Sequence, residues 1–204
     1  MRYTAEHKDQ THRRIVSTAA RAFKRHGLQG VGIADLMKKA GLTHGGFYAH
    51  FPDRDTLVAE ATAAGYEEAA ERLLAHLAEA PSDETPRVLL DRYLGSAHRA
   101  HADSGCPLPA LAADMSRQPT TVRRAFTDCF RRYSNRLAAL LPSRQKTHRE
   151  DTAYALLAGL AGSIMLARAV SDPELSDRIL AASRQFYLDA VSYTHLTLPT
   201  IYSV

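Results

Sequence analysis

Apolar residues recur at helical spacing along most of this chain, and the clearest case lies near its N-terminus. The apolar positions there are three or four residues apart: Ile33, Leu36, Met37 and Ala40. Gly41 follows where a helix end favours a residue that tolerates positive φ, and the Thr43 hydroxyl can cap a new helix. The pattern predicts a first helix that stops at Gly41, a tight turn, and a second helix over 43–51.

The side chains of that second helix divide into two faces. Phe47 and Phe51 are four residues apart, so we expect them to be buried together as its anchor. The opposite face holds only small residues: Gly45, Gly46 and Ala49. Polar side chains flank this small face: Thr43 and His50 at one edge, His44 and Tyr48 at the other. Adjacent glycines cost about 1 kcal/mol each relative to alanine in a helix, so a purely structural helix has little reason to carry two.

These features favour a helix that approaches the floor of a DNA groove and is held there at its edges. A glycine-broken hairpin that only packs inside a helical domain remains the alternative. Pro52 ends the second helix, and Asp53 can cap a third one. The free N–H groups of that third helix, together with Arg54, are expected to face a phosphate.

Further helices are predicted along the rest of the chain, separated by breaks rich in Pro, Gly and polar residues. The breaks lie at 81–86, 103–107 and 142–148. The expected helices are 53–80, 87–102, a short one after 107, 120–141, 151–168 and 173–191. No alternating run rich in Val or Ile appears, so the fold class is predicted to be all-α.

The segment 151–168 is unusual because every residue from Thr152 to Ala167 is uncharged. Small residues keep one of its sides open: Ala155, Ala158, Gly159, Gly162 and Ser163. These sixteen uncharged residues are fewer than the ~20 that span a bilayer, so the segment is predicted to be a buried helix in close helix packing. On this pattern alone, the core helix of a monomer is the favoured interpretation.

Charge is distributed unevenly along the 204 residues. The first 54 residues contain ten Lys or Arg against four acidic residues, a net charge of +6, whereas the remainder carries sixteen basic and eighteen acidic residues. A basic N-terminal segment favours binding to a polyanion, so this charge distribution supports DNA as the partner. The N-terminus offers charge but no apolar signal-peptide core, so a cytoplasmic location is expected.

The N-terminal residues resemble the DNA-binding domain of TetR-family transcriptional regulators. The similarity covers roughly Thr11 to Ala61, with its apolar, glycine and aromatic positions in register. The residues that carry it are Phe23, Gly27, Ile33 to Leu36, Ala40 to Thr43, Gly46 to Pro52 and Arg54 to Leu57. Two positions depart from the family: Gly32 replaces the usual Ser or Thr cap, and Arg54 replaces the usual Lys, which keeps the charge.

The resemblance implies a three-helix helix-turn-helix head at 1–54 and a larger helical body at 55–191 that binds an effector and dimerises. Helices at about 148–170 and 173–191 would form the four-helix bundle of a homodimer. The usual role is a repressor that binds a palindromic operator in double-stranded DNA and is released by a small molecule or an electrophile. By the family's pattern, Thr43, Tyr48 and His50 contact phosphates, His44 and Gly45 lie near bases, and Gly46 and Arg54 complete the set.

Effector-binding residues are harder to predict. Aromatic and apolar side chains that could line a pocket, or simply form the core, are Tyr66, Leu73, Leu89, Tyr93, Leu111, Phe126, Phe130 and Tyr133. Cys106 follows Gly105 and precedes a predicted helix, whose N-terminus can favour a thiolate. Some electrophile sensors of the TetR family carry a similar Gly-Cys pair, and a buried structural cysteine is the alternative.

Two rival classes remain open, although neither has a supporting motif. His98 and His101 are three residues apart and near Asp103, which would suit a metal-dependent enzyme, but no further ligands occur at defined spacing, so exposed histidines are expected. A helical adaptor that binds proteins is the second rival. We expect no enzymatic activity, no cofactor and no metal. The residues 192–204 carry no charge and break the preceding helical pattern, so they are expected to be a non-native or disordered tail.

Overall fold

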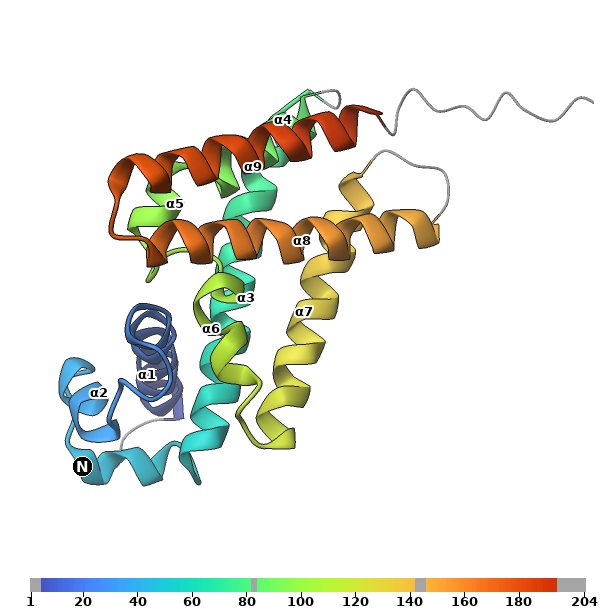
Figure 1. Ribbon diagram of the computed structural model, residues 1–204. Helices are drawn as coiled ribbons and strands as arrows, with labels where there is room; N and C mark the ends of the chain where they lie inside the picture. Colours follow the sequence, from blue (N-terminus) through green and yellow to red (C-terminus); the bar gives the residue numbers. More distant parts are fainter. Residues whose placement is uncertain (1–4, 82–83, 142–145, 194–204) are drawn as a thin grey trace, which may run out of the picture. The chain divides into compact units, whose positions relative to one another are not determined.

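The computed structural model describes residues 5–81, 84–141 and 146–193, without the side chains of 78 and 191–193. Within these ranges the regular elements are all helices, which confirms the predicted fold class (Figure 1). They are α1 (Ala5–His26), α2 (Ile33–Lys39), the 3₁₀ helix η1 (His44–Ala49), α3 (Arg54–Ala78), α4 (Thr85–Tyr93), α5 (Ser96–Ala100), α6 (Pro107–Met115), α7 (Thr120–Leu140), α8 (Lys146–Ala169) and α9 (Pro173–Tyr193).

The chain packs as two compact units. The first unit holds residues up to Arg72 together with 101–133, and the second holds 73–100 together with the residues from Ser134 onward. This division follows packing, and the functional boundary after residue 54 stays a prediction. The helices α3 and α7 each contribute to both units.

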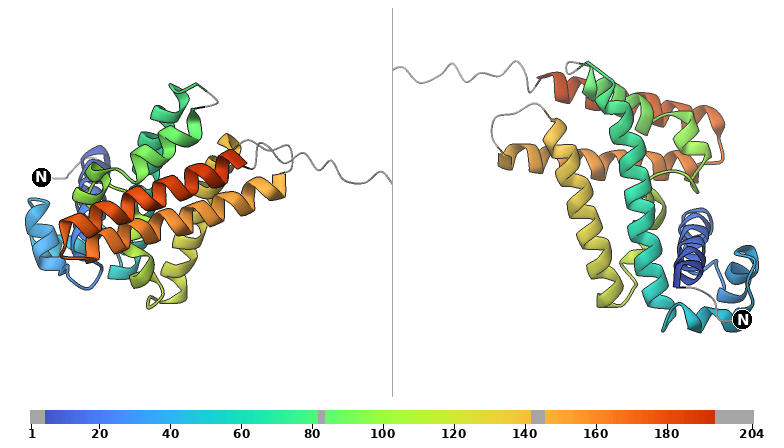
Figure 2. Two further views of the ribbon diagram at one scale, coloured as in Figure 1. Left: turned by 45° about the horizontal axis from the view of Figure 1, so that its top comes forward. Right: turned by 180° about the vertical axis from the view of Figure 1, so that it is seen from behind.

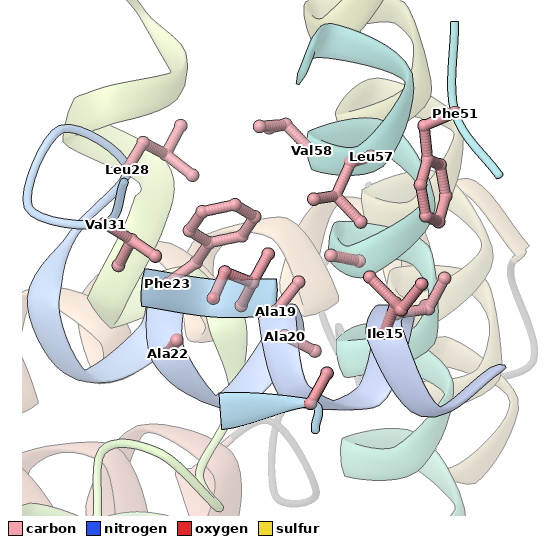
Figure 3. Packing of buried hydrophobic residues seen from close by; sticks show 14 of the residues in the cluster. Ile15, Ala19, Ala20, Ala22, Phe23, Leu28, Val31, Phe51, Leu57 and Val58 are labelled. Atoms are coloured by element: carbon pink, nitrogen blue, oxygen red, sulfur yellow. The ribbon is translucent and has the colours of Figure 1, made fainter. Parts of the chain in front are cut away.

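The first unit has one continuous apolar core. Figure 3 shows Phe23 of α1 directed toward Leu57 and Val58 of α3, and all three side chains are buried. Leu111 of α6 and Val122 of α7 belong to the same cluster. Burial of each such large side chain stabilises the fold by about 1.5–3 kcal/mol. The helix-turn-helix segment therefore shares its core with residues far away in the sequence.

The turn between α2 and η1 contains the glycine with positive φ that the sequence predicted. Gly41 adopts φ +73°, and the Leu42 N–H donates to the Met37 carbonyl at 2.8 Å to close the helix end. Two details were predicted wrongly. The second helix is a 3₁₀ helix of six residues, and Thr43 precedes it without a capping hydrogen bond from its hydroxyl among the described residues. A short segment with two glycines forms a stable α-helix poorly, and short helical segments often adopt the 3₁₀ form.

Three other predicted boundaries need correction. The expected helix 87–102 is two helices, because the chain turns at Gly95, where a Cβ would lie 2.8 Å from the Asp91 carbonyl oxygen. The expected loop 142–148 overlaps the first turn of α8, which begins at Lys146, while 142–145 lie outside the described residues. The helix α9 continues to Tyr193, two residues into the expected tail, and 194–204 also lie outside the description.

The second unit is built around α8 and α9, which run side by side in Figure 1 and in both views of Figure 2. Close approach requires Gly159, because a Cβ at that position would lie 1.7 Å from the Tyr187 hydroxyl oxygen. The Ser176 hydroxyl donates to the Ala167 carbonyl at 2.6 Å and ties the two helices at their shared end. The predicted buried helix 151–168 lies within α8 and has buried residues such as Leu157, Leu160 and Ile164.

The helix α8 also carries apolar residues that are not buried. Leu166 is 60% exposed, and Tyr154 and Met165 are exposed to a smaller extent. By length and composition alone, α8 could cross a membrane, and it is the one such helix among the described residues. Its buried side packs within the second unit, which is what the core helix of a folded domain requires.

Candidate nucleic-acid interface

The anchor of η1 is the pair Phe47 and Phe51, as predicted. Both side chains are fully buried, and their rings stack with centroids 5.5 Å apart. The His12 ring of α1 also stacks with Phe51, with ring centroids 4.5 Å apart. These contacts fix η1 against α1, so the opposite side of η1 is held outward without depending on its own helical propensity.

That outward side carries the predicted polar and small residues. Tyr48 is 65% exposed, and Thr43, His44, Gly45 and Ala49 are exposed as well. Gly46 and His50 are half-buried. A Cβ added to Gly45 would meet no described atom within 4 Å, so the packing of this chain does not itself require a glycine there.

The start of α3 is capped as predicted. The Thr56 N–H and the Thr56 hydroxyl both donate to Asp53 Oδ1 at 2.7 Å. These hydrogen bonds to the charged carboxylate lower the pKa of Asp53. The entry into α3, directly after the anchor, is therefore fixed by a local hydrogen-bond network.

Arg54 is held within the first unit. Its Nη2 donates to the Leu28 carbonyl, and its guanidinium lies 5.7 Å from the centroid of the Phe23 ring. The sequence predicted a phosphate contact for this residue, which stays a prediction. The contact with Leu28 could not be read from the sequence, because it joins residues 26 positions apart.

Two histidines and a lysine form the basic edge of the interface. The His50 and His12 ring centroids are 6.0 Å apart, and His12 Nε2 lies 2.6 Å from Glu60 Oε2. Burial lowers the pKa of His50, and the neighbouring His12 and Lys8 lower it further. His50 is therefore mainly neutral at pH 7, with Glu60 directed to His12.

Comparison with family models identifies the fold. The model of the bacterial tetR-family regulatory proteins matches residues 15–61, and that of the tetracyclin repressor-like C-terminal domain matches residues 86–183. The chain belongs to the TetR family. Its first match spans α1, α2, η1 and the start of α3, so these are the DNA-binding helix-turn-helix of a TetR-family transcription regulator.

Solved structures of TetR-family proteins share this fold. A transcriptional regulator from Cytophaga hutchinsonii aligns with a TM-score of 0.74 and 19% identity, covering 92% of this chain and 98% of that one. A regulator from Chloroflexus aurantiacus J-10-FL gives 0.73 and 22%, covering 91% and 96%. The reduced form of E. coli NemR gives 0.70 and 18%, covering 88% and 96%. Comparison with curated proteins gives no match.

The residues predicted for the effector site are divided between the two units. Tyr66 packs edge-on against Phe126 and Tyr133, each at 5.8 Å, in the first unit. Phe130 is half-buried on the same helix as Phe126. Leu111 is part of the apolar core of the first unit, and Tyr93 belongs to the second unit.

Cys106 is the residue directly before α6 and is buried, as is Cys129. The Tyr133 hydroxyl donates to the Cys106 sulfur, and burial raises the pKa of Tyr133 well above its ordinary value. The Tyr66 hydroxyl is buried without a hydrogen-bond partner among the described residues, and burial raises its pKa as well. The Cys106 thiol and the hydroxyls of Tyr66 and Tyr133 are thus polar groups in a buried, largely apolar environment.

The remaining chemistry gives the rival classes no new support. His98 is half-buried and its Nδ1 lies 2.7 Å from the Tyr93 carbonyl oxygen, so it is not the exposed histidine that we expected, whereas His101 is exposed. Across the described ranges no three His, Cys, Asp or Glu residues gather into a candidate metal site.

The side chains of Lys24 and Asp114 connect the α1 region to α6 and to the loop before α6, and the sequence analysis did not predict either contact. Lys24 is buried and donates to the Gly105 carbonyl at 3.2 Å, and the Leu28 N–H donates to Asp114. The only available signal was a lysine on the apolar face of an amphipathic helix.

Proposed function

We propose that this protein is a transcriptional repressor that binds a palindromic operator as a homodimer and is released by an effector. The observation that carries the DNA contact is the outward side of η1. Gly45 faces open space beside the exposed Tyr48 and His44, so the small residue suits an outside partner that approaches closely. We assign phosphate contacts to Thr43, Tyr48 and His50, and base contacts to His44 and Gly45, with Gly46 keeping the approach open.

We place Arg54 differently from the initial prediction. Because its guanidinium is occupied by the Leu28 carbonyl and the Phe23 ring, it joins the start of α3 to α1 and the turn that follows α1. Any phosphate contact by Arg54 would have to use the donors that remain on the guanidinium.

The homodimer is proposed to form through α8 and α9. The large apolar residues exposed along these helices support it: Tyr154, Met165, Leu166, Leu175 and Phe186. Phe186 is 66% exposed and Leu166 is 60% exposed, and several large apolar residues exposed on two helices suit an interface with a second copy. A two-fold dimer presents two heads to half-sites about 34–36 Å apart or multiples of that spacing.

The effector is proposed to bind beside the cluster of Tyr66, Phe126 and Tyr133. The Tyr66 hydroxyl supports this, since a buried donor without a protein partner can be satisfied by a polar group on a ligand. Phe130 and Cys106 are the further candidates in the first unit, and Tyr93, which belongs to the second unit, stays a prediction from the sequence.

Cys106 decides whether the effector can be an electrophile. Its burial favours a structural role, whereas a hydrogen bond from Tyr133 and its place before α6 suit a reactive thiolate. If Cys106→Ser leaves release from DNA by quinones or hypochlorous acid unchanged, Cys106 is not the sensor of these electrophiles.

The experiment that tests the proposed function is selection of bound DNA from a random pool by the full chain at moderate salt. We expect an enriched palindrome, bound by two copies of the chain and weakened steeply as salt rises. A transcription reporter that carries the selected site then separates repression from activation. Failure to enrich any two-fold site would overturn the proposal and favour the adaptor.

A further inference from the structure

A surface pocket of 420 Å³ lies between the N-terminal end of α1 and η1, inside the first unit. Its polar lining residues are His7, Lys8, Thr11, Thr43 and His50, and the other residues that line it are small or apolar. Among the described residues that line it, none is acidic. Since two helices supply its walls, the pocket combines residues of the helix-turn-helix with residues that precede it by more than 30 positions.

The charges around the pocket are arranged for an anion. On this part of α1, His7 and Lys8 line the pocket, His12 lies one turn further on, and the acidic residues Glu6 and Asp9 are not among the lining residues. On α3 the Glu60 carboxylate is directed to His12 Nε2 at 2.6 Å. His44 and Tyr48 lie on η1 itself, with their rings 6.5 Å apart. The Glu60 carboxylate is therefore engaged by His12, and Lys8 and His50 share the pocket.

His50 has an incomplete environment in the free protein. Its Nδ1 is shielded from water and has no hydrogen-bond partner among the described residues. Burial and the positive charge of Lys8 favour the neutral ring and lower the pKa of His50. A negative oxygen in the pocket would reverse both effects, because it supplies a counter-charge for the imidazolium and an acceptor for its N–H.

We propose that this pocket holds a backbone phosphate of the bound DNA between Lys8 and His50, and that its occupation is coupled to protonation of His50. The proposal rests on the proposed DNA-binding function and extends it to α1, which lies outside the helix-turn-helix contacts. Thr43 and Thr11 can donate hydroxyl hydrogen bonds to the same phosphate. DNA affinity would then rise as pH falls, because the complex holds one more proton than the free protein.

The test measures affinity for the selected operator between about pH 5.5 and 8, a range that brackets the ordinary histidine pKa. For the wild-type chain we expect affinity to rise by up to about tenfold for each unit that pH falls inside the coupled window. His50→Gln keeps a donor but cannot titrate, so it should flatten this dependence. Lys8→Gln should weaken binding and reduce the slope of log affinity against log salt by about 0.9.

Lys146→Gln removes the same charge from α8 in the second unit and serves as the matched control, with no change in salt slope expected. If the operator is bound but His50→Gln keeps the wild-type pH dependence, or Lys8→Gln keeps the wild-type salt slope, the phosphate pocket is wrong while the proposed function stands. If the wild-type chain selects no operator, the proposed function itself fails.

The source of the phosphate is separated by NMR titration of the His50 ring. We expect operator DNA to raise the His50 pKa and inorganic phosphate at the same phosphate concentration to leave it unchanged. An equal rise with inorganic phosphate alone would contradict a DNA phosphate and indicate a pocket for free anions. No rise with either would overturn the proposal.

Discussion

The Leu28 backbone N–H donates to Asp114 Oδ2 at 2.8 Å, which joins the turn after α1 to the last turn of α6. At the other end of α6, Lys24 donates to the Gly105 carbonyl at 3.2 Å. The two contacts bracket α6 along α1, and Leu111 between them packs into the core that also holds Phe47. The segment 101–133 is thus bound into the same body as the helix-turn-helix.

Removing the Asp114 acceptor should destabilise this body. Leu28 is fully buried, so Asp114→Ala leaves its N–H without a partner and is expected to lower the free energy of unfolding by about 1–3 kcal/mol. Urea unfolding followed by circular dichroism measures the change. Arg117→Gln is the control, since it removes only the exposed ion pair to Asp114 and should cost at most about 1 kcal/mol. Equal stability of Asp114→Ala and wild type would contradict the role of this hydrogen bond.

Because of Lys24, the free energy of unfolding should depend on pH in the alkaline range. Burial lowers the pKa of Lys24 below its value in the unfolded chain, so between these two pKa values the unfolded state binds more protons. Stability therefore rises with pH through that window, and the gain is complete above the unfolded value. Lys24→Met should remove this rise while Glu68 keeps its contact with Arg72 at 2.8 Å.

The measurement for Lys24 is the difference in urea midpoint between wild type and Lys24→Met at several pH values from neutral upward. We expect the urea midpoint of the wild type to rise relative to that of Lys24→Met as pH rises. A difference that stays constant with pH would mean that Lys24 titrates as it does in the unfolded chain.

Local sequence patterns predicted the parts of the interface that depend on neighbours in the chain. The Phe47 and Phe51 anchor, the positive φ of Gly41 and the Asp53 cap are all set within a few residues, and the structure confirms them. The contacts of Arg54 and Asp114 were not predictable, because their partners lie 26 and 86 positions away. Which residues of an all-helical body face a ligand likewise depends on packing that helical spacing alone does not determine.

Gly159 and Gly162 offer a matched pair on α8. Gly159→Ala places a Cβ against the Tyr187 hydroxyl and should destabilise the packing of α8 on α9 by about 1–3 kcal/mol. Gly162→Ala meets no described atom within 4 Å and should stabilise the helix by up to about 1 kcal/mol. Thermal unfolding compares them, with the oligomeric state of each variant followed by light scattering because α8 belongs to the proposed dimer face. A Gly159→Ala variant as stable as Gly162→Ala would refute the close approach.

Gly45 should matter for DNA and not for folding. Its missing side chain faces open space, so Gly45→Leu is expected to change the free energy of unfolding by at most about 0.5 kcal/mol. The added bulk should lower affinity for the selected operator by at least about tenfold, because it blocks close approach to the groove. Fluorescence anisotropy with labelled operator measures the loss, and Ala97→Leu on α5 adds bulk at an exposed site as the control. Unchanged affinity of Gly45→Leu would remove η1 from the DNA contact.

The most direct test of the account is to repeat the random-pool selection with His44→Ala beside the wild-type chain. His44 is exposed on η1 while the buried Phe47 and Phe51 keep the helix in place, so the variant should still fold and dimerise. We expect the two operators to share their half-site spacing and to differ in base preference at symmetric positions of the two half-sites. Identical operators from both proteins would contradict the claim that η1 reads the bases.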